Sequence, residues 1–176
     1  FGDDSNNSDY GIDTTWLFDK VKEYMLDYLQ ELHIPHERYD LYVQKWWPVV
    51  TSLGGVVSAH THNNAHFSVV YYVSVPTIVD RDPGSIAFHS PQDHWGNHIG
   101  ASVSDKGVGE SGARFVPSTG DLIIFPSILK HSVTQNEYDI KRMSISLDIT
   151  LTRNETTSER STDEMSVPNP SLWTKL

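Results

Sequence analysis

The sequence contains no cysteine, has few cations for its length and lacks any long apolar run. Without cysteine, the chain can form neither disulfides nor thiolate metal sites, so a metal must be held by histidine, carboxylate, amide or water. That donor set suits Fe(II), Mn(II), Zn(II) or Ni(II). Lysine and arginine number 13 against 23 aspartates and glutamates, which gives a formal net charge of −10. We therefore expect no binding to nucleic acid or to an anionic membrane, since both require clustered cations.

Two further absences concern targeting. No apolar run approaches the roughly 20 residues that span a membrane, and we expect a cytoplasmic protein. The chain begins at Phe1 rather than at methionine and shows no signal peptide, which leads us to expect that an upstream piece has been left out.

What is present indicates one globular, aromatic-rich domain, since 38% of the 176 residues are apolar. Apolar residues recur at three- and four-residue spacing from Leu17 to Leu32, which predicts an amphipathic helix that ends before Pro35. β-Branched and aromatic runs separated by turn residues then predict strands at 41–50, 55–61, 66–76, 84–88, 113–117, 121–125, 131–135 and 142–151. This order is typical of a mainly β sandwich or barrel of the jelly-roll type.

We expect three segments along the chain. Residues 1–13 form a polar, flexible lead-in, residues 14–151 a single domain, and residues 152–176 a Ser/Thr/Glu-rich, largely disordered tail. Leu172 and Trp173 near the end of that tail could dock on this chain or on a second copy, so a homodimer stays open.

Three histidines form a candidate metal site. His60 and His62 are separated by one residue on a predicted strand, where alternate side chains share a face. His131, from a distant strand, would complete a facial set of three ligands with positions left open for substrate and oxygen. Chance pairing is the alternative, because the chain contains 9 histidines.

Arg142 and Ser144 share one face of another predicted strand, downstream of His131. An arginine that points into a barrel needs an anionic partner, because burying a lone charge is costly. Its planar fork pairs with a carboxylate through two hydrogen bonds, and a nearby hydroxyl can add a third. The partner is either a ligand carboxylate or an aspartate or glutamate of the chain itself.

Several other polar and aromatic residues are candidates for substrate contacts. The stretch 89–112 is long and glycine-rich, which favours a lid or a substrate-selecting loop. The candidates are His66, His89, His94, His98, Trp95 and Trp47, although any of these histidines could equally be a surface residue.

Two blocks of sequence resemble a known family. Segment 47–72, with His60, His62, Ser68 and Tyr72, resembles the His-x-His-Pro and Ser-Gly-Val-Tyr-Tyr block of the 2-oxoglutarate- and Fe(II)-dependent oxygenases common in cyanophage and marine bacterial genomes. Segment 120–149 is similar to the same family's Gly-Asp, Phe-Pro, His and Arg-x-Ser block. The family belongs to the prolyl-hydroxylase-like superfamily.

The resemblance implies a double-stranded β-helix (a cupin-like barrel) with Fe(II) at its mouth. His60 and His131 would be iron ligands, and Arg142 with Ser144 would clamp the far carboxylate of 2-oxoglutarate, which Tyr72 would also meet. Trp47 would be a wall residue. The wider superfamily usually has an acid where this chain has His62, so either His62 is a ligand or it faces the substrate while water coordinates the metal. His62 also argues against a halogenase, which needs a small residue there.

The expected function is oxidation, most simply hydroxylation, of a C–H bond of a small polar substrate such as an amino acid or a metabolite derived from one, with release of succinate and CO2. Fe(II) is the cofactor, and 2-oxoglutarate and O2 are cosubstrates. Two alternatives are a cupin-like three-histidine dioxygenase or isomerase that does not use 2-oxoglutarate, and a non-catalytic barrel that binds a small molecule.

Overall fold

The computed structural model describes residues 13–77, 80–89, 113–153 and 173–176. These residues form one α-helix, α1 (Thr15–Glu31), a short 3-10 turn, η2 (His36–Arg38), and two antiparallel sheets. The mainly β architecture with a supporting N-terminal helix, predicted from the sequence, is confirmed. Residues 1–12 of the predicted lead-in and residues 154–172 of the predicted tail lie outside the described residues. The flexibility of the lead-in and the disorder of the tail therefore stay predictions.

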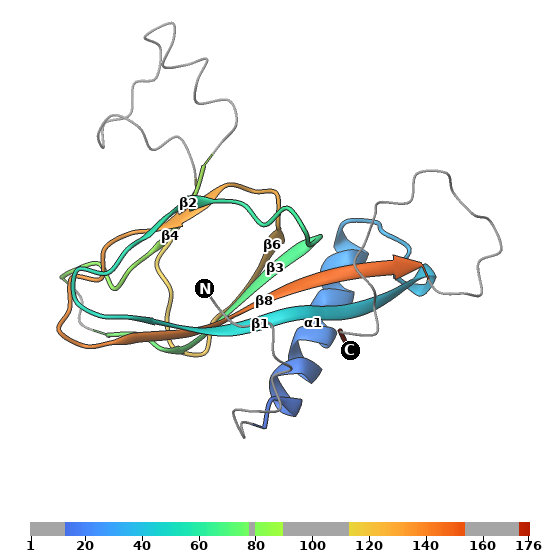
Figure 1. Cartoon of the computed structure of the whole chain (residues 1–176), viewed down its shortest axis with the longest axis horizontal. Coiled ribbons are helices and arrows are strands. Elements are labelled where there is room, and N and C mark those ends of the chain that lie inside the picture. The colour runs from blue at the N-terminus through green and yellow to red at the C-terminus, as the bar shows by residue number, and fades with distance from the viewer. Residues whose placement is uncertain (1–12, 78–79, 90–112, 154–172) are drawn as a thin grey trace, which may run out of the picture.

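The larger sheet has the strand order β6-β3-β8-β1-β9. Its strands are β1 (Tyr39–Thr51), β3 (Phe67–Ser74), β6 (Leu122–Pro126), β8 (Arg142–Arg153) and β9 (Thr174–Lys175). The smaller sheet has the order β2-β7-β4-β5, with β2 (Val57–His60), β4 (Ile86–Phe88), β5 (Arg114–Phe115) and β7 (His131–Val133). Figure 1 shows β2 and β4 across an open ring from β1 and β8, the arrangement of a double-stranded β-helix.

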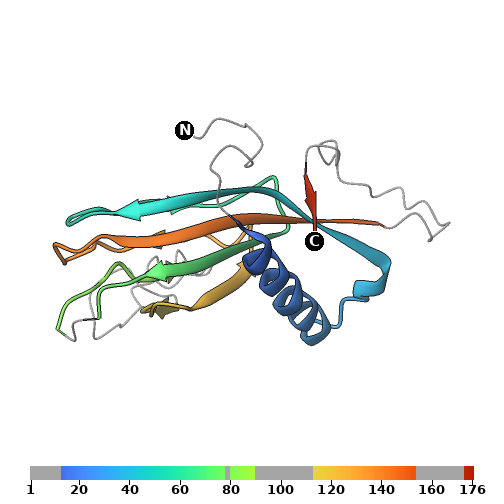
Figure 2. The same cartoon turned by 90° about the horizontal axis from the view of Figure 1, so that it is seen from below.

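Helix α1 packs against the larger sheet through one stripe of apolar side chains. Leu17, Val21, Met25 and Leu29 are buried at the spacing of one helix face. They meet Leu41, Val43, Trp46, Phe67, Val69, Leu147 and Ile149 from β1, β3 and β8. Figure 2 shows the helix lying across one end of this sheet. This core stabilises the long strands from one side and leaves the space between the two sheets for the site.

Strand β8 is the central strand of the larger sheet and pairs with β1 on one side and β3 on the other. The register on the β1 side shifts between Val43 and Lys45, so Gln44 is an extra residue, a β-bulge. Such a bulge changes which side chains of a strand face the interior. Val43 packs in the helix-facing core before the bulge, and Trp47 and Val49 line the cavity between the sheets after it.

Two elements include residues beyond 151, the predicted end of the domain. Strand β8 continues to Arg153, and β9 forms next to β1 from residues of the predicted tail. Trp173 packs edge-on against Tyr42, with the two ring centroids 5.8 Å apart. Within the described residues, no helix is long and apolar enough to cross a membrane.

Candidate metal centre and cosubstrate cavity

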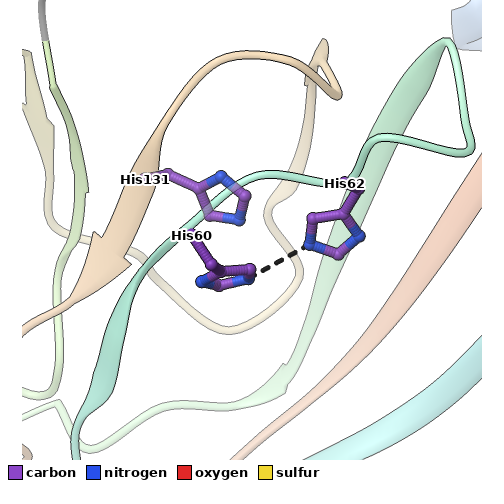
Figure 3. A group of neighbouring side chains, drawn as sticks. All are labelled: His60, His62 and His131. Carbon is purple, nitrogen blue, oxygen red and sulfur yellow. Dashed lines mark hydrogen bonds between the residues drawn. The ribbon is translucent and has the colours of Figure 1, made fainter.

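Three histidines from two strands and a loop converge at one end of the smaller sheet. His60 is the last residue of β2, and the β2–β7 register places it directly opposite His131, the first residue of β7. His62 lies beyond the end of β2, so strand alternation does not explain its position. Instead, its backbone N–H donates to the carbonyl of Ser127 (2.9 Å), which joins the loop after β2 to the segment between β6 and β7. One ring nitrogen from each histidine lies within 4.8 Å of the others (Figure 3).

Each ring is oriented by a hydrogen bond at Nδ1. His60 Nδ1 donates to the carbonyl of Ser58 (2.8 Å), and His131 Nδ1 donates to the carbonyl of Leu129 (2.9 Å). His62 Nδ1 donates to Oδ1 of Asp148 (2.8 Å). Carbonyl and carboxylate oxygens only accept, so these partners place the hydrogen on Nδ1 and leave the Nε2 lone pair free in a neutral ring. This is the tautomer a metal requires.

The Nε2 atoms fit a metal ion for a second reason. Nε2 of His60 and Nε2 of His62 lie 3.1 Å apart, and in these tautomers both are lone-pair acceptors. Two such lone pairs facing each other repel unless a cation or a proton lies between them. Burial also lowers the pKa of His131 to about 4, with His60 and His62 acting in the same direction, so the ring is neutral near pH 7. A neutral imidazole is the form that coordinates metals.

Arg142 also lines the space between the sheets and is the largest fully buried side chain among the described residues. One Nη donates to the carbonyl of Gly84 (2.6 Å) and the other to Oγ1 of Thr51 (3.1 Å), while Nε has no hydrogen-bond partner within the part of the chain that the structure describes. Among the described residues, no carboxylate forms an ion pair with this guanidinium. Tyr72 and, to a smaller extent, Asp82 raise the pKa of Arg142 electrostatically, but Asp82 is bonded to Arg114. Burial lowers the pKa of Arg142, as expected for a cation that water does not reach. The site therefore holds a buried cation with room for an anion.

A cavity of about 90 Å³ connects the histidines and the arginine. Its lining includes His60, His62, His131, Arg142, Ser144, Ser146, Ser68, Tyr72, Trp47 and the apolar side chains of Val49, Val57, Val69, Val70, Ile86, Phe125, Val133 and Leu147. The Tyr72 ring lies 5.7 Å from the guanidinium carbon of Arg142. Burial raises the pKa of Tyr72 to about 12, so its hydroxyl keeps its proton and can donate to an anion.

The remaining predicted residues fall in different places. Trp47 lines the cavity and stacks on His62, with ring centroids 5.8 Å apart. His66 accepts a hydrogen bond at Nδ1 from the backbone of Leu151 (3.1 Å), and His89 Nε2 bonds to Oγ of Ser132 (2.9 Å). Neither is among the described residues that line the cavity. His94, His98 and Trp95 lie outside the described residues.

Asp148 contacts the cluster, although it was not among the residues predicted from the sequence. It is buried on β8 and accepts from His62 as described above. Strand alternation offered a signal, because Asp148 continues the series of Arg142, Ser144 and Ser146 on one face of β8. Spacing alone could not show that this face meets the loop after β2.

A family model described as "Putative 2OG-Fe(II) oxygenase" matches residues 45–148, more than half of the chain and all of the residues discussed above that line the cavity. No curated protein has a sequence that matches.

Solved structures of the same class resemble the chain at low identity. An oxidoreductase of the 2OG-Fe(II) oxygenase family from Burkholderia pseudomallei is 15% identical with a TM-score of 0.47, covering 73% of this chain and 57% of that one. A prolyl-4-hydroxylase from Pseudomonas putida is 14% identical with a TM-score of 0.48, covering 74% and 63%. The α-ketoglutarate-dependent epimerase SnoN from nogalamycin biosynthesis is 16% identical with a TM-score of 0.47, covering 77% and 64%. The chain thus spans less than two thirds of the length of each. On the family match, the chain belongs to the 2OG-Fe(II) oxygenases.

Proposed function

We propose that this protein is an Fe(II)- and 2-oxoglutarate-dependent oxygenase that hydroxylates a C–H bond of a small polar molecule. One oxygen atom of O2 would enter the substrate and the other would enter succinate, formed from 2-oxoglutarate with loss of CO2. Amino acids and metabolites derived from them are the substrate class we favour. A cytoplasmic location and a homodimer stay predictions from the sequence.

The observation that carries this proposal is the buried, carboxylate-free Arg142 in the same cavity as the three histidines. A guanidinium without an anionic partner is costly to bury, and its fork matches a carboxylate. A dicarboxylate that reaches from the metal to Arg142 would supply that partner. The family match is independent support, because these oxygenases use both Fe(II) and 2-oxoglutarate.

The residues would divide the work between the two ends of the cavity. At one end, Nε2 of His60, His62 and His131 would hold Fe(II). At the other end, Arg142 would pair with the far carboxylate of 2-oxoglutarate, and the hydroxyls of Ser144 and Tyr72 would add hydrogen bonds. When bound, Fe(II) and 2-oxoglutarate supply the oxygen activation, which is chemistry that side chains cannot perform.

The rest of the lining would exclude water. Ile86, Phe125 and Val133 form apolar walls between the two ends, and water excluded there strengthens the charge pairing at Arg142. Trp47, stacked on His62, would form the wall on the substrate side. The polar substrate class rests on the polarity of the 89–112 stretch, of which residues 90–112 lie outside the described residues.

The test is succinate formation from 2-oxoglutarate in air, with Fe(II) supplied and without added substrate, since such enzymes turn over slowly when uncoupled. We expect wild-type protein to form succinate and His131→Ala to form none. Arg142→Gln should raise the KM for 2-oxoglutarate by about 10- to 100-fold, the size expected for losing a charge-assisted hydrogen bond pair. Arg38→Gln, on the exposed turn before β1, is the matched arginine control and should match wild type.

Two results would contradict the proposal. Iron-dependent oxygen consumption that does not respond to 2-oxoglutarate would indicate the cupin-like enzyme, in which Arg142 binds the substrate directly. No iron binding by folded wild-type protein would leave only the non-catalytic binding module.

A further inference from the structure

The three-histidine cluster itself carries no negative charge to balance a bound cation. Three neutral imidazoles contribute no negative charge to a divalent ion, and a buried ion without nearby anions is costly. Among the described residues, Asp148 is the one carboxylate bonded to a ring of the cluster. A role for this residue at the metal depends on the metal site of the proposed function.

Asp148 is buried and fixed by three strands. It is 2% exposed, and its register partners are Lys45 on β1 and Ser68 on β3. Oδ1 accepts from His62 Nδ1 (2.8 Å) and more weakly from the hydroxyl of Ser68 (3.4 Å). Oδ2 pairs with Nζ of Lys45 (3.1 Å). The carboxylate therefore bridges an imidazole on the inner side and an ammonium on the solvent side.

The β-bulge at Gln44 produces this arrangement. Because Val43 pairs with Ile149 and Lys45 pairs with Asp148, one residue of β1 is skipped between the two pairs. In an unbulged strand, Gln44 would lie opposite Asp148 and Lys45 one position further along. The bulge thus places a cation beside a buried carboxylate, next to a candidate active site, where bulges are common.

The His62–Asp148 hydrogen bond is largely buried, since the side chain of His62 is 12% exposed and that of Asp148 is 2% exposed, and Trp47 packs beside it. The Trp47 ring stacks on His62 with 19° between the planes, and Nζ of Lys45 lies 4.9 Å from the centroid of the same indole. The Asp148–His62 contact is consequently in a region of low dielectric, where a charge-assisted hydrogen bond is stronger than in water.

We infer that Asp148 is a positioning residue for the metal centre: it fixes the Nδ1–H tautomer of His62 and supplies, through that ring, negative charge that the three imidazoles lack. A carboxylate behind a metal-bound histidine raises the basicity of the ligand and sets its orientation. Lys45 acts in the opposite direction, because its ammonium draws charge away from the carboxylate. Since Lys45 is 56% exposed, solvent weakens its effect.

The test measures the affinity of the metal-free protein for Co(II) and Zn(II) by calorimetry, without 2-oxoglutarate or turnover. Asp148→Asn keeps the shape and an accepting oxygen but removes the charge, and we expect it to bind both metals about 10- to 100-fold more weakly than wild type. Lys45→Met should bind them at least as tightly as wild type. A purely structural role for the Lys45–Asp148 pair predicts that both variants weaken binding, so the opposite signs separate the two explanations.

A second readout uses the metal-free protein alone. Long-range ¹H–¹⁵N NMR should show His62 with its proton on Nδ1 in wild type, and a mixture of tautomers in Asp148→Ala. Equal metal affinity in wild type and Asp148→Asn, or an unchanged His62 tautomer in Asp148→Ala, would overturn the inference. Failure of the wild type to bind any metal would instead count against the proposed function, and the tautomer measurement would still decide whether Asp148 positions His62.

Discussion

At the scale of single residues, the site depends on which nitrogen of each histidine faces the protein. In all three rings, Nδ1 is bonded to an oxygen of the chain, so Nε2 is left for the metal. The geometry is thus set before any metal binds. Histidine side chains that are already held in orientation lose less conformational entropy when the metal binds.

The buried His131 predicts how the metal-free protein responds to acid. Its folded pKa of about 4 lies below the ordinary value near 6.5, so as pH falls below 6.5 the unfolded chain takes up this proton first. The contribution of the neutral His131 ring to the free energy of unfolding is therefore complete above pH 6.5. As pH falls toward 4 this contribution is lost, at up to about 1.4 kcal/mol per pH unit. Urea unfolding of metal-free protein between pH 7.5 and pH 4.5 should show this slope. His131→Gln should show a shallower one, and equal slopes would contradict the assignment.

The residue types needed for the site could be read from the sequence, but the partners that decide their roles could not. His60, His62, His131, Arg142, Ser144 and Tyr72 were predicted as a group, and the fold brings them around one cavity. His66 belongs to the same histidine-rich stretch, yet its Nδ1 is used by the backbone of Leu151, a contact 85 residues away in sequence. Asp148 was missed for the same reason, since its contact with His62 spans 86 residues.

At the scale of elements, the turn before β4 supports the arginine. Gly84 has φ +93, and its carbonyl accepts from Arg142. A Cβ added there would lie 3.1 Å from an Nη of Arg142 and 3.3 Å from the carbonyl of Thr134. The guanidinium would have to move by a few tenths of an ångström, so this turn fixes the depth of the positive charge in the cavity.

Gly84→Ala should therefore weaken 2-oxoglutarate binding several-fold and destabilise the fold by about 1–2 kcal/mol, the cost of a left-handed backbone in an L-residue. Gly120→Ala is the matched control, because Gly120 has the same φ of +93 and no atom within 4 Å of the added Cβ. It should lose similar stability and keep wild-type affinity. Calorimetry and urea unfolding of both variants measure the two effects, and equal loss of affinity in both would show that the contact with Arg142 is unimportant.

Element positions were predictable from hydrophobic periodicity, and element ends were less so. All eight predicted strands are present, with ends that differ by a few residues, as for the predicted 55–61 and the observed Val57–His60. Strand β9 was not predicted, because Thr174 and Lys175 carry no alternating pattern and form a strand only by pairing with β1. Neither the bulge at Gln44 nor the pairing of Lys45 with Asp148 has a local sequence signal.

At the scale of the whole molecule, the two sheets contribute different parts of the site. The smaller sheet and its loop carry His60, His62 and His131, and the larger sheet carries Arg142, Ser144 and Tyr72. The His62–Asp148 hydrogen bond joins the two sets directly. The core beneath α1 holds the larger sheet from one side, which leaves the interior between the sheets for ligands.

The central claim is that Fe(II) and 2-oxoglutarate bind together in this one cavity. Anaerobic titration of the purified protein with Fe(II) and then 2-oxoglutarate tests it most directly, because joint binding gives a visible metal-to-ligand charge-transfer band. We expect the band in wild type, its absence in His131→Ala, and a shift to about 10- to 100-fold higher 2-oxoglutarate concentration in Arg142→Gln. Iron bound by wild-type protein with no band at saturating 2-oxoglutarate would contradict the claim.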